Sequence, residues 1–199
     1  QAVGKPVRVQ LMREQESGWE PKGTGQLIRL RGGVDEQGNV VAYELQTSYP
    51  SNLSPTLALV LTGKVKNERK VLQMGDRTSI LLYDYPSVRA VSLDAAPLVR
   101  SSWFRGVSAL PNVLAHECWI DECAFIAKAD PIEYRLRYMK DQRAVGVMKA
   151  ARRMSKWQEG VAHRNPAAAD EKIAKGRGFA YARYFHSKFP GFGAAWAAW

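Results

Sequence analysis

The sequence predicts an α+β fold in which a small mixed sheet with a hairpin is joined to a three-helix segment. Two observations support the sheet: apolar and polar residues alternate near the N-terminus, and a turn-rich Asp-Glu-Gln-Gly-Asn segment separates two strand-like runs. A third supports the helices, because helix start signals and helical spacing recur over residues 111–157. We expect a strand-rich part over residues 1–98, a helical segment over 99–157, and a linker, a final strand and an atypical tail over 158–199.

The composition is that of a packed globular chain. Of 199 residues, 46% are hydrophobic and 10% aromatic, which is enough to build a core. No apolar run approaches the roughly 18 residues of a membrane span, and the N-terminus lacks the apolar centre of a signal peptide. The net charge of +10 favours a polyanion, such as nucleic acid, an acidic subunit or a phosphate-bearing cofactor, without choosing among them.

The first predicted strand lies at the N-terminus. Val7, Val9 and Leu11 alternate with polar or unbranched neighbours, which predicts a strand over residues 6–13 with one buried face. The acidic and glycine-containing stretch over residues 14–25 is expected to be a loop.

The clearest predicted element is the hairpin. Residues 26–33 and 40–48 are its two arms. In the second arm, Val41, Tyr43 and Leu45 are expected to share one face, and Ala42, Glu44 and Gln46 the other. The following residues, 49–96, are expected to be mostly irregular, with a strand or two.

Three helices are expected in the helical segment. Residues 111–128 begin with a proline, which suits a first helical turn. Asp130 can cap a second helix in which Pro131 takes the first position and Glu133 is the acid of a capping box. Apolar residues at helical spacing predict a third helix over residues 142–157.

A bulky, cationic turn precedes the first of these helices. It reads Trp103-Phe104-Arg105-Gly106. Arg105 would place a fixed cation at the mouth of a helix N-terminus, where free N–H groups and the helix dipole also favour negative charge. This arrangement predicts a site for an anion or an oxo ligand. The alternative is that Arg105 forms an ordinary surface ion pair.

A second motif suggests nucleic acid. The sequence RGFAYARY, within a strand candidate over residues 176–184, nearly matches the aromatic octapeptide on which RNA-recognition motifs stack bases. The chain that follows is too short and too glycine-rich for the rest of that fold. A basic RNA- or protein-binding module is therefore the alternative function, and it requires Phe179, Tyr181 and Tyr184 to be exposed on one face of a sheet.

No catalytic or metal-binding set can be assembled from the sequence. His116 and Glu117 resemble the start of a zinc-binding helix, but position 120 is Ile rather than the second His. Cys118 and Cys123 lie five positions apart in a predicted helix and are interpreted as core thiols.

Seven ordered segments carry a family resemblance. They are KPVRVQLMRE, GWEPKG, GGVDEQGNVVAYE, GDR…LLYDYP, FRGVSALPNVLAHECWIDECA, ADPIEYRLRYMKDQRA and GRGFAYARY. Together they resemble the molybdopterin-binding large subunit of the xanthine oxidase and aldehyde oxidase family, in particular its bacterial isoquinoline oxidoreductase, nicotinate dehydrogenase and membrane-linked aldehyde dehydrogenase types. The resemblance covers Lys5 to about Tyr184 and implies a central fragment of a longer subunit.

The resemblance implies an oxidoreductase that hydroxylates an electron-poor carbon of an N-heterocycle or aldehyde, with water supplying the oxygen. It implies a molybdenum–molybdopterin cofactor, expected in the cytosine dinucleotide form. It also implies a partner small subunit that carries iron–sulfur clusters, with a cytochrome subunit as a further candidate partner. Arg105 and Gly106 match the turn that contacts this cofactor, and Val107 matches a position that lines the substrate pocket. The family occurs both in the cytoplasm and in exported form, so the compartment stays open.

Three features of that family have no counterpart in the sequence. They are a glycine-rich loop, an upstream glutamine that approaches the metal, and a late Gly-Glu segment whose carboxylate acts as general base. The resemblance therefore assigns no catalytic residue and predicts that these 199 residues alone are inactive. The tail FHSKFPGFGAAWAAW also departs from the family, and a truncated or frame-shifted gene end is one hypothesis for it. A catalytically inactive scaffold that docks a partner subunit is a third interpretation.

Overall fold

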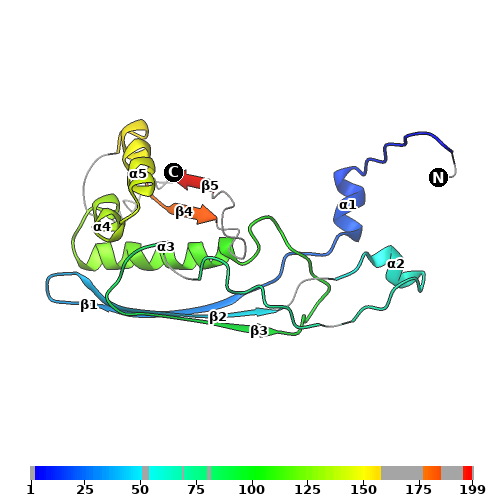
Figure 1. Cartoon of the computed structure of the whole chain (residues 1–199), viewed down its shortest axis with the longest axis horizontal. Coiled ribbons are helices and arrows are strands. Elements are labelled where there is room, and N and C mark those ends of the chain that lie inside the picture. Colours follow the sequence, from blue (N-terminus) through cyan, green and yellow to red (C-terminus); the bar gives the residue numbers. More distant parts are fainter. Residues whose placement is uncertain are drawn as a thin grey trace, which may run out of the picture.

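The structure is a computed structural model, and it describes residues 3–50, 54–68, 70–79, 82–157, 177–184 and 195–198. A three-stranded sheet forms one layer, a long helix lies along one face of it, and two further helices stack on that helix (Figure 1). Two short helices, α1 and α2, lie at the opposite end of the sheet (Figure 1). The combination of a small sheet and a helical segment that the sequence predicts is therefore present.

The sheet is built around its central strand, β2 (Val40–Pro50). The antiparallel hairpin partner is β1 (Leu27–Val34), as predicted, and β3 (Val88–Ala95) pairs with the other edge of β2 in parallel. The apolar run that follows β2 forms the short helix α2 (Leu57–Leu61). The first half of the chain thus supplies a sheet in the order β1-β2-β3.

A bulge in the hairpin corrects one prediction. The pairing register shifts near the end of β1, so that Val41 is the extra residue on β2. Because of this shift, Val40 takes the buried position with 1% of its surface exposed, whereas Val41 is 45% exposed. Of the three residues predicted to share one face, Tyr43 and Leu45 are buried together, and Val41 is not on their face.

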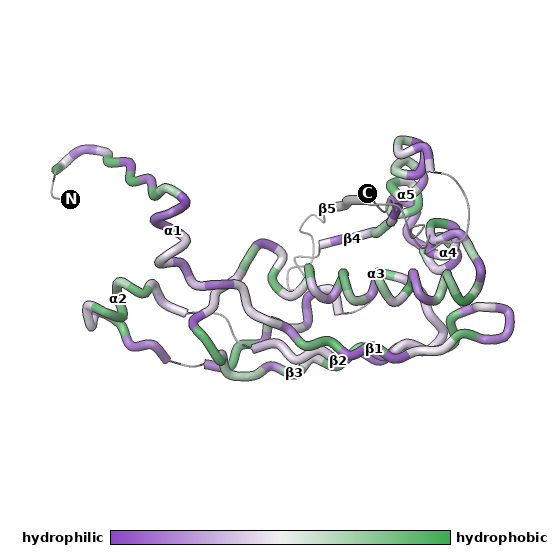
Figure 2. The backbone as a smooth tube through the Cα atoms, turned by 180° about the vertical axis from the view of Figure 1, so that it is seen from behind, coloured by the Kyte–Doolittle hydropathy of each residue, from purple (hydrophilic) through white to green (hydrophobic). Residues whose placement is uncertain are grey.

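The predicted N-terminal strand is wrong. Residues 6–12 are extended but pair with no described strand, and every residue from Val3 to Glu20 is exposed. The predicted loop instead contains helix α1 (Arg13–Trp19), which buries none of its residues. Figure 2 shows the alternating hydropathy along an arm that stands away from the sheet. Alternation alone does not make a strand, because the backbone groups of a strand need a neighbour to pair with.

The three predicted helices are present and begin with local caps. Oδ1 of Asp130 accepts hydrogen bonds from the backbone N–H groups of Ile132 and Glu133, and Asp141 caps the next helix in the same way. Glu133 forms an ion pair with Arg152 of that next helix. No helix within the described residues is long and apolar enough to cross a membrane. The helices are α3 (Ala109–Ile126), α4 (Pro131–Tyr138) and α5 (Gln142–Met154).

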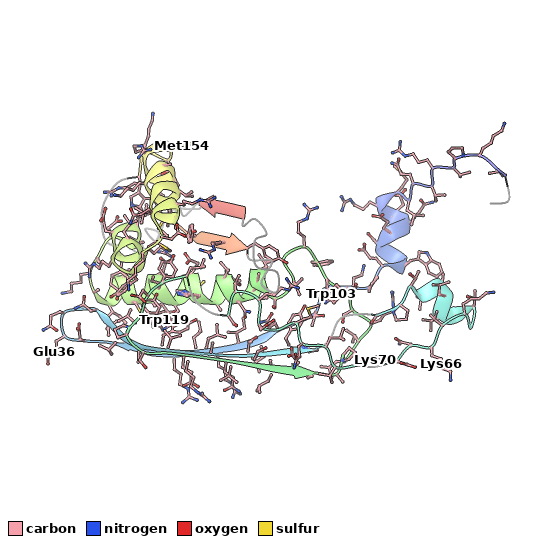
Figure 3. The ribbon with its side chains drawn as sticks, viewed as in Figure 1. Glu36, Lys66, Lys70, Trp103, Trp119 and Met154 are labelled. Carbon is pink, nitrogen blue, oxygen red and sulfur yellow. The ribbon has the colours of Figure 1, made fainter. Side chains whose placement is uncertain are left out.

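The core lies between α3 and the sheet and continues up to α4 and α5. Trp119 of α3 packs directly on Gly32 of β1, where an added Cβ would lie 2.3 Å from Cζ2 of the indole ring. Figure 3 shows this indole between α3 and the sheet. The buried apolar residues of this core include Val40, Tyr43, Leu45, Tyr83, Tyr85, Ile120, Cys123, Ala124, Ile132, Tyr134, Met148, Phe179 and Tyr181.

A second, two-stranded sheet lies above α3. Its strands are β4 (Tyr181–Tyr184) and β5 (Ala195–Ala198), which pair antiparallel (Figure 1). Strand β4 is the last part of the predicted strand over residues 176–184. The predicted linker over residues 158–175 and most of the predicted tail over 185–199 lie outside the described residues.

Candidate functional site

A cavity of about 520 Å³ lies at the N-terminal end of α3. Its walls come from two segments that are far apart in the sequence: the turn before α3 together with the start of that helix, and strand β4. Its volume falls within the roughly 300–1,000 Å³ that is usual for small-molecule and cofactor sites. The lining residues are Phe104, Arg105, Gly106, Val107, Ala109, Leu110, Val113, Ala182, Arg183 and Tyr184.

The turn that carries Arg105 has an unusual backbone. Gly106 has a φ of +94° and Val107 a φ of +54°. Glycine adopts a positive φ freely, but a β-branched residue there is a true outlier, at a cost of about 1–2 kcal/mol. The turn is closed by hydrogen bonds from Val107 N to Phe104 O (3.0 Å) and from Ala109 N to Gly106 O (2.9 Å). Such outliers persist only where surrounding contacts impose them, and they cluster at functional sites.

The contacts that impose this conformation come from the loop at residues 74–79. The buried hydroxyl of Ser108 donates to the carbonyl of Met74 and accepts from the backbone N–H of Arg77 at 3.2 Å. Thr78 in the same loop also has a positive φ, +56°, and its hydroxyl donates to the carbonyl of Ala109 at 3.3 Å. The turn at Gly106 and Val107 and the loop at residues 74–79 are therefore both strained, and their hydrogen bonds hold each other in place directly behind the cavity wall.

Arg105 and Arg183 make the cavity cationic. Arg105 is exposed and forms no ion pair with any residue that the structure describes, so the predicted alternative of a surface ion pair is not observed there. Arg183 lies on the opposite wall, where its Nη1 is 3.4 Å from Oδ2 of Asp141. Burial lowers the pKa of Arg183, although Tyr181 and Asp141 oppose that shift. With the positive end of the α3 dipole beside them, these groups favour an anionic ligand.

A buried ion pair fastens the opposite wall to α3. Arg135 donates from Nε to Oε2 of Glu117 at 2.8 Å and from Nη1 to Oδ1 of Asp121 at 2.7 Å. Glu117 also accepts from the backbone N–H of Tyr181 and from the hydroxyl of Tyr83, both at 2.8 Å. Burial raises the pKa of Glu117, although the Arg135 guanidinium and these donors oppose the shift. Because Tyr181 begins β4, this carboxylate positions β4 against α3.

His116 lies in the same buried layer and is a packed core residue. Its Nε2 is 3.4 Å from the hydroxyl of Tyr85, and its ring stacks on Tyr83 with centroids 5.0 Å apart. Burial, aided by the charge of Arg135, lowers the pKa of His116 to about 3, so the imidazole is neutral. Among the described residues, no group of three or more His, Cys, Asp or Glu side chains could hold a metal ion.

Most of the chain matches a recognised class of domain. The chain is a member of the molybdopterin cofactor-binding domain family, which matches residues 1–139 and so includes the sheet, the Arg105 turn, α3 and α4. A curated relative is a nicotinate dehydrogenase subunit of Pseudomonas putida, which is 58% identical over 200 residues. That match covers 100% of this chain and 17% of the relative, so the chain spans about one sixth of the relative's length.

The structure places the three predicted site residues, which are consecutive in the chain, in the wall of the cavity. Arg105, Gly106 and Val107 all line the cavity, and their individual roles stay predictions. The opposite wall, formed by Arg183 and Tyr184, was not predicted from the sequence. The signal for it was present in the segment GRGFAYARY, which belongs to the family resemblance but was also interpreted as an RNA-binding octapeptide.

The burial of that octapeptide leaves the RNA-binding alternative unsupported. Phe179 is 4% exposed and Tyr181 is 1% exposed, so neither ring can stack on a base. Phe179 instead packs against Trp157, with ring centroids 6.5 Å apart, and lies under the Arg135 guanidinium. Phe179 and Tyr181 of this motif therefore belong to the core, whereas Tyr184 lines the cavity.

Proposed function

We propose that this chain is part of an oxidoreductase large subunit and that its 520 Å³ cavity receives the molybdenum–molybdopterin cofactor. The observation that carries the proposal is the strained turn of Arg105, Gly106 and Val107 in the cavity wall. Family membership supports a molybdopterin ligand. The guanidinium of Arg105 supports phosphate or oxo groups on that ligand, because its planar fork of N–H donors matches such oxyanions.

The residues of the cavity fit such a group. Arg105 would bind and orient its anionic part, and Gly106 would let the backbone approach it closely, since no Cβ intervenes. Val107 would form an apolar wall beside the substrate. When bound, the cofactor supplies the two-electron redox chemistry of the proposed reaction.

The proposed reaction is hydroxylation of an electron-poor carbon of an N-heterocycle or an aldehyde, with water as the source of oxygen. The name of the relative supports a pyridine carboxylate such as nicotinate as the substrate class. Because that relative is named as one subunit of its enzyme, it also supports assembly with other subunits. We also propose that the cofactor is in the cytosine dinucleotide form. The proposed partners are an iron–sulfur small subunit and, as a further candidate, a cytochrome subunit. The net charge of +10 suits an acidic surface on such a partner.

Molybdenum analysis of the protein purified from its native source tests the binding. We expect about one molybdenum per polypeptide in the wild type and a clearly lower content in Arg105→Ala, because loss of a charge-assisted hydrogen bond worth about 1.5–3 kcal/mol weakens binding by about 10- to 150-fold. Arg105→Lys should be intermediate, since it keeps the charge but loses the fork. The matched control is Arg29→Ala, which removes an exposed arginine from β1 and should leave the metal content unchanged.

Two results would contradict different parts of this proposal. A wild type without molybdenum would contradict the function. Full molybdenum in Arg105→Ala would contradict only the placement of the cofactor at this cavity. Turnover of nicotinate or an aldehyde in water labelled with oxygen-18 tests the reaction, and the label is expected in the hydroxylated product.

A further inference from the structure

Asn112 is fully buried in the first turns of α3, and its carboxamide joins three parts of the chain. Nδ2 donates to the carbonyl oxygens of Gly75 at 3.0 Å and Arg77 at 2.9 Å. Oδ1 accepts from Nε2 of Gln26, just before β1, at 2.8 Å. The site thus requires two donors and one acceptor on one short side chain, which an asparagine provides.

The loop that Asn112 holds is also tied to the sheet. Oδ1 of Asp94 in β3 accepts from the backbone N–H groups of Met74 at 3.3 Å and Gly75 at 3.0 Å. Gly75 has no room for a side chain, because an added Cβ would lie 2.8 Å from Cβ of Tyr49 in β2. The loop at residues 74–79 is therefore clamped between α3 on one side and the sheet on the other.

Both walls of the cavity are bonded to this clamped loop. On one side, Ser108 connects the loop to the strained turn that carries Arg105. On the other, Nη1 of Arg77 donates to the hydroxyl of Tyr184 in β4 at 3.2 Å. A displacement of the loop would therefore change the shape of the cavity on both sides.

We propose that Asn112 is a positioning residue for the cofactor-binding turn. Its two donated hydrogen bonds hold the Gly75–Arg77 backbone against α3, and that backbone, through Ser108, imposes the left-handed conformation at Val107 that presents Arg105 to the cavity. Asn112 itself does not line the cavity. The inference rests on the proposed function, and it adds to that function the structural cause of the strain in the turn.

Asn112→Asp is the sharpest variant, because it keeps the shape of the side chain and replaces both Nδ2 donors by an acceptor. Gln26→Ala is the matched control, since it removes the third hydrogen bond of Asn112 and leaves both bonds to the loop in place. Both are to be made in the native gene, so that the protein is studied with all of its natural subunits.

The first measurement is hydrogen exchange at the backbone amides of Val107 and Ala109, which close the turn. Exchange there should be at least tenfold faster in Asn112→Asp and less than threefold faster in Gln26→Ala. The amides of Tyr134 and Val145 bond within the first turns of α4 and α5, and they should exchange as in the wild type. Equal acceleration at all four amides, or none at Val107 and Ala109, would overturn the proposal.

The second measurement reports on the cofactor itself. Molybdenum content should fall at least fivefold in Asn112→Asp, and the paramagnetic resonance spectrum of the remaining molybdenum should differ from that of the wild type and of Gln26→Ala. An unchanged spectrum in Asn112→Asp would overturn the positioning role. If the wild type held no molybdenum, the proposed function would fail, whereas amide exchange would still decide whether Asn112 sets the turn.

Ser108→Ala keeps the inference testable if Asn112→Asp does not fold. It removes the hydroxyl that links the loop to the turn while leaving the carboxamide bonds of Asn112 intact. Faster exchange confined to Val107 and Ala109 is expected. Wild-type exchange at both amides in Ser108→Ala would refute the route from Asn112 to Val107.

Discussion

The two ends of the molecule are built in opposite ways. At one end α3, α4, α5 and the sheet interlock, and Trp119 lies between them with its ring 4.8 Å from that of Tyr43. At the other end, α1 and α2 bury no residue at all, and Trp19 is 54% exposed. Both ends contain amphipathic patterns in the sequence. The difference shows that such a pattern becomes a packed element only where a second surface receives its apolar side.

Removal of a buried charge is expected to give the largest difference in stability between the two ends. Glu117→Ala leaves the Arg135 guanidinium buried without the buried one of its two carboxylate partners, which should lower the free energy of unfolding by about 3–5 kcal/mol. The matched change at the open end is Glu16→Ala in α1, where the carboxylate is exposed and the expected change is within about 0.5 kcal/mol. Urea unfolding of the two variants measures the difference. Similar values for both would show that the two ends do not differ as described.

Two glycines give an intermediate test in which the expected signs differ. Gly32→Ala forces a methyl group against the Trp119 indole and should destabilise the protein by about 3 kcal/mol through overpacking. Gly18→Ala in α1 meets open space and should only raise the helicity of α1, by up to about 1 kcal/mol. Calorimetry and circular dichroism distinguish the two effects. A Gly32→Ala protein as stable as the wild type would mean that the indole can move away from β1.

The smallest expected effect comes from the buried imidazole of the packed end. The pKa of His116 is lowered from 6.5 to about 3, so below pH 6.5 the unfolded chain binds a proton that the folded protein excludes. The contribution of this group is therefore complete above pH 6.5 and is lost as the pH falls toward 3, by about 1.4 kcal/mol per pH unit.

The His116→Gln variant isolates the contribution of this imidazole to the pH dependence of stability. Between pH 7 and pH 5, the wild type should lose roughly 2 kcal/mol more stability than the variant, because all other titrating groups are shared. Urea unfolding of both proteins at the two pH values checks this. Equal losses in the two proteins would indicate that the imidazole is accessible to protons in the folded state.

The elements that could be predicted from the sequence are those with local causes. Asp130 and Pro131 specify the start of α4 within four residues, and the Asp-Glu-Gln-Gly-Asn turn specifies the hairpin. The N-terminal strand could not be settled this way, because its existence depends on a pairing partner. The bulge at Val41 likewise depends on the pairing of β2 with β1, and alternation within one strand does not reveal it.

The same distinction applies to the candidate site. Arg105 could be located because a cation directly before a helix start is a local signal. The opposite wall and the loop at residues 74–79 could not, because they reach the turn only through tertiary contacts such as those of Ser108 and Glu117. The family resemblance contained the segments of both walls, but it did not say that they face each other across one cavity.

The parallel pairing of β2 with β3 also orders events during synthesis. β2 ends at Pro50 and β3 begins only at Val88, so the ribosome needs on the order of a few seconds to deliver the second strand after the first. Throughout that interval the nascent hairpin presents an unpaired edge and the uncovered side chains of Tyr43 and Leu45. During that interval the exposed edge and apolar face of the hairpin can associate with other nascent chains. This tendency to aggregate ends once α3 has left the exit tunnel and covers the sheet.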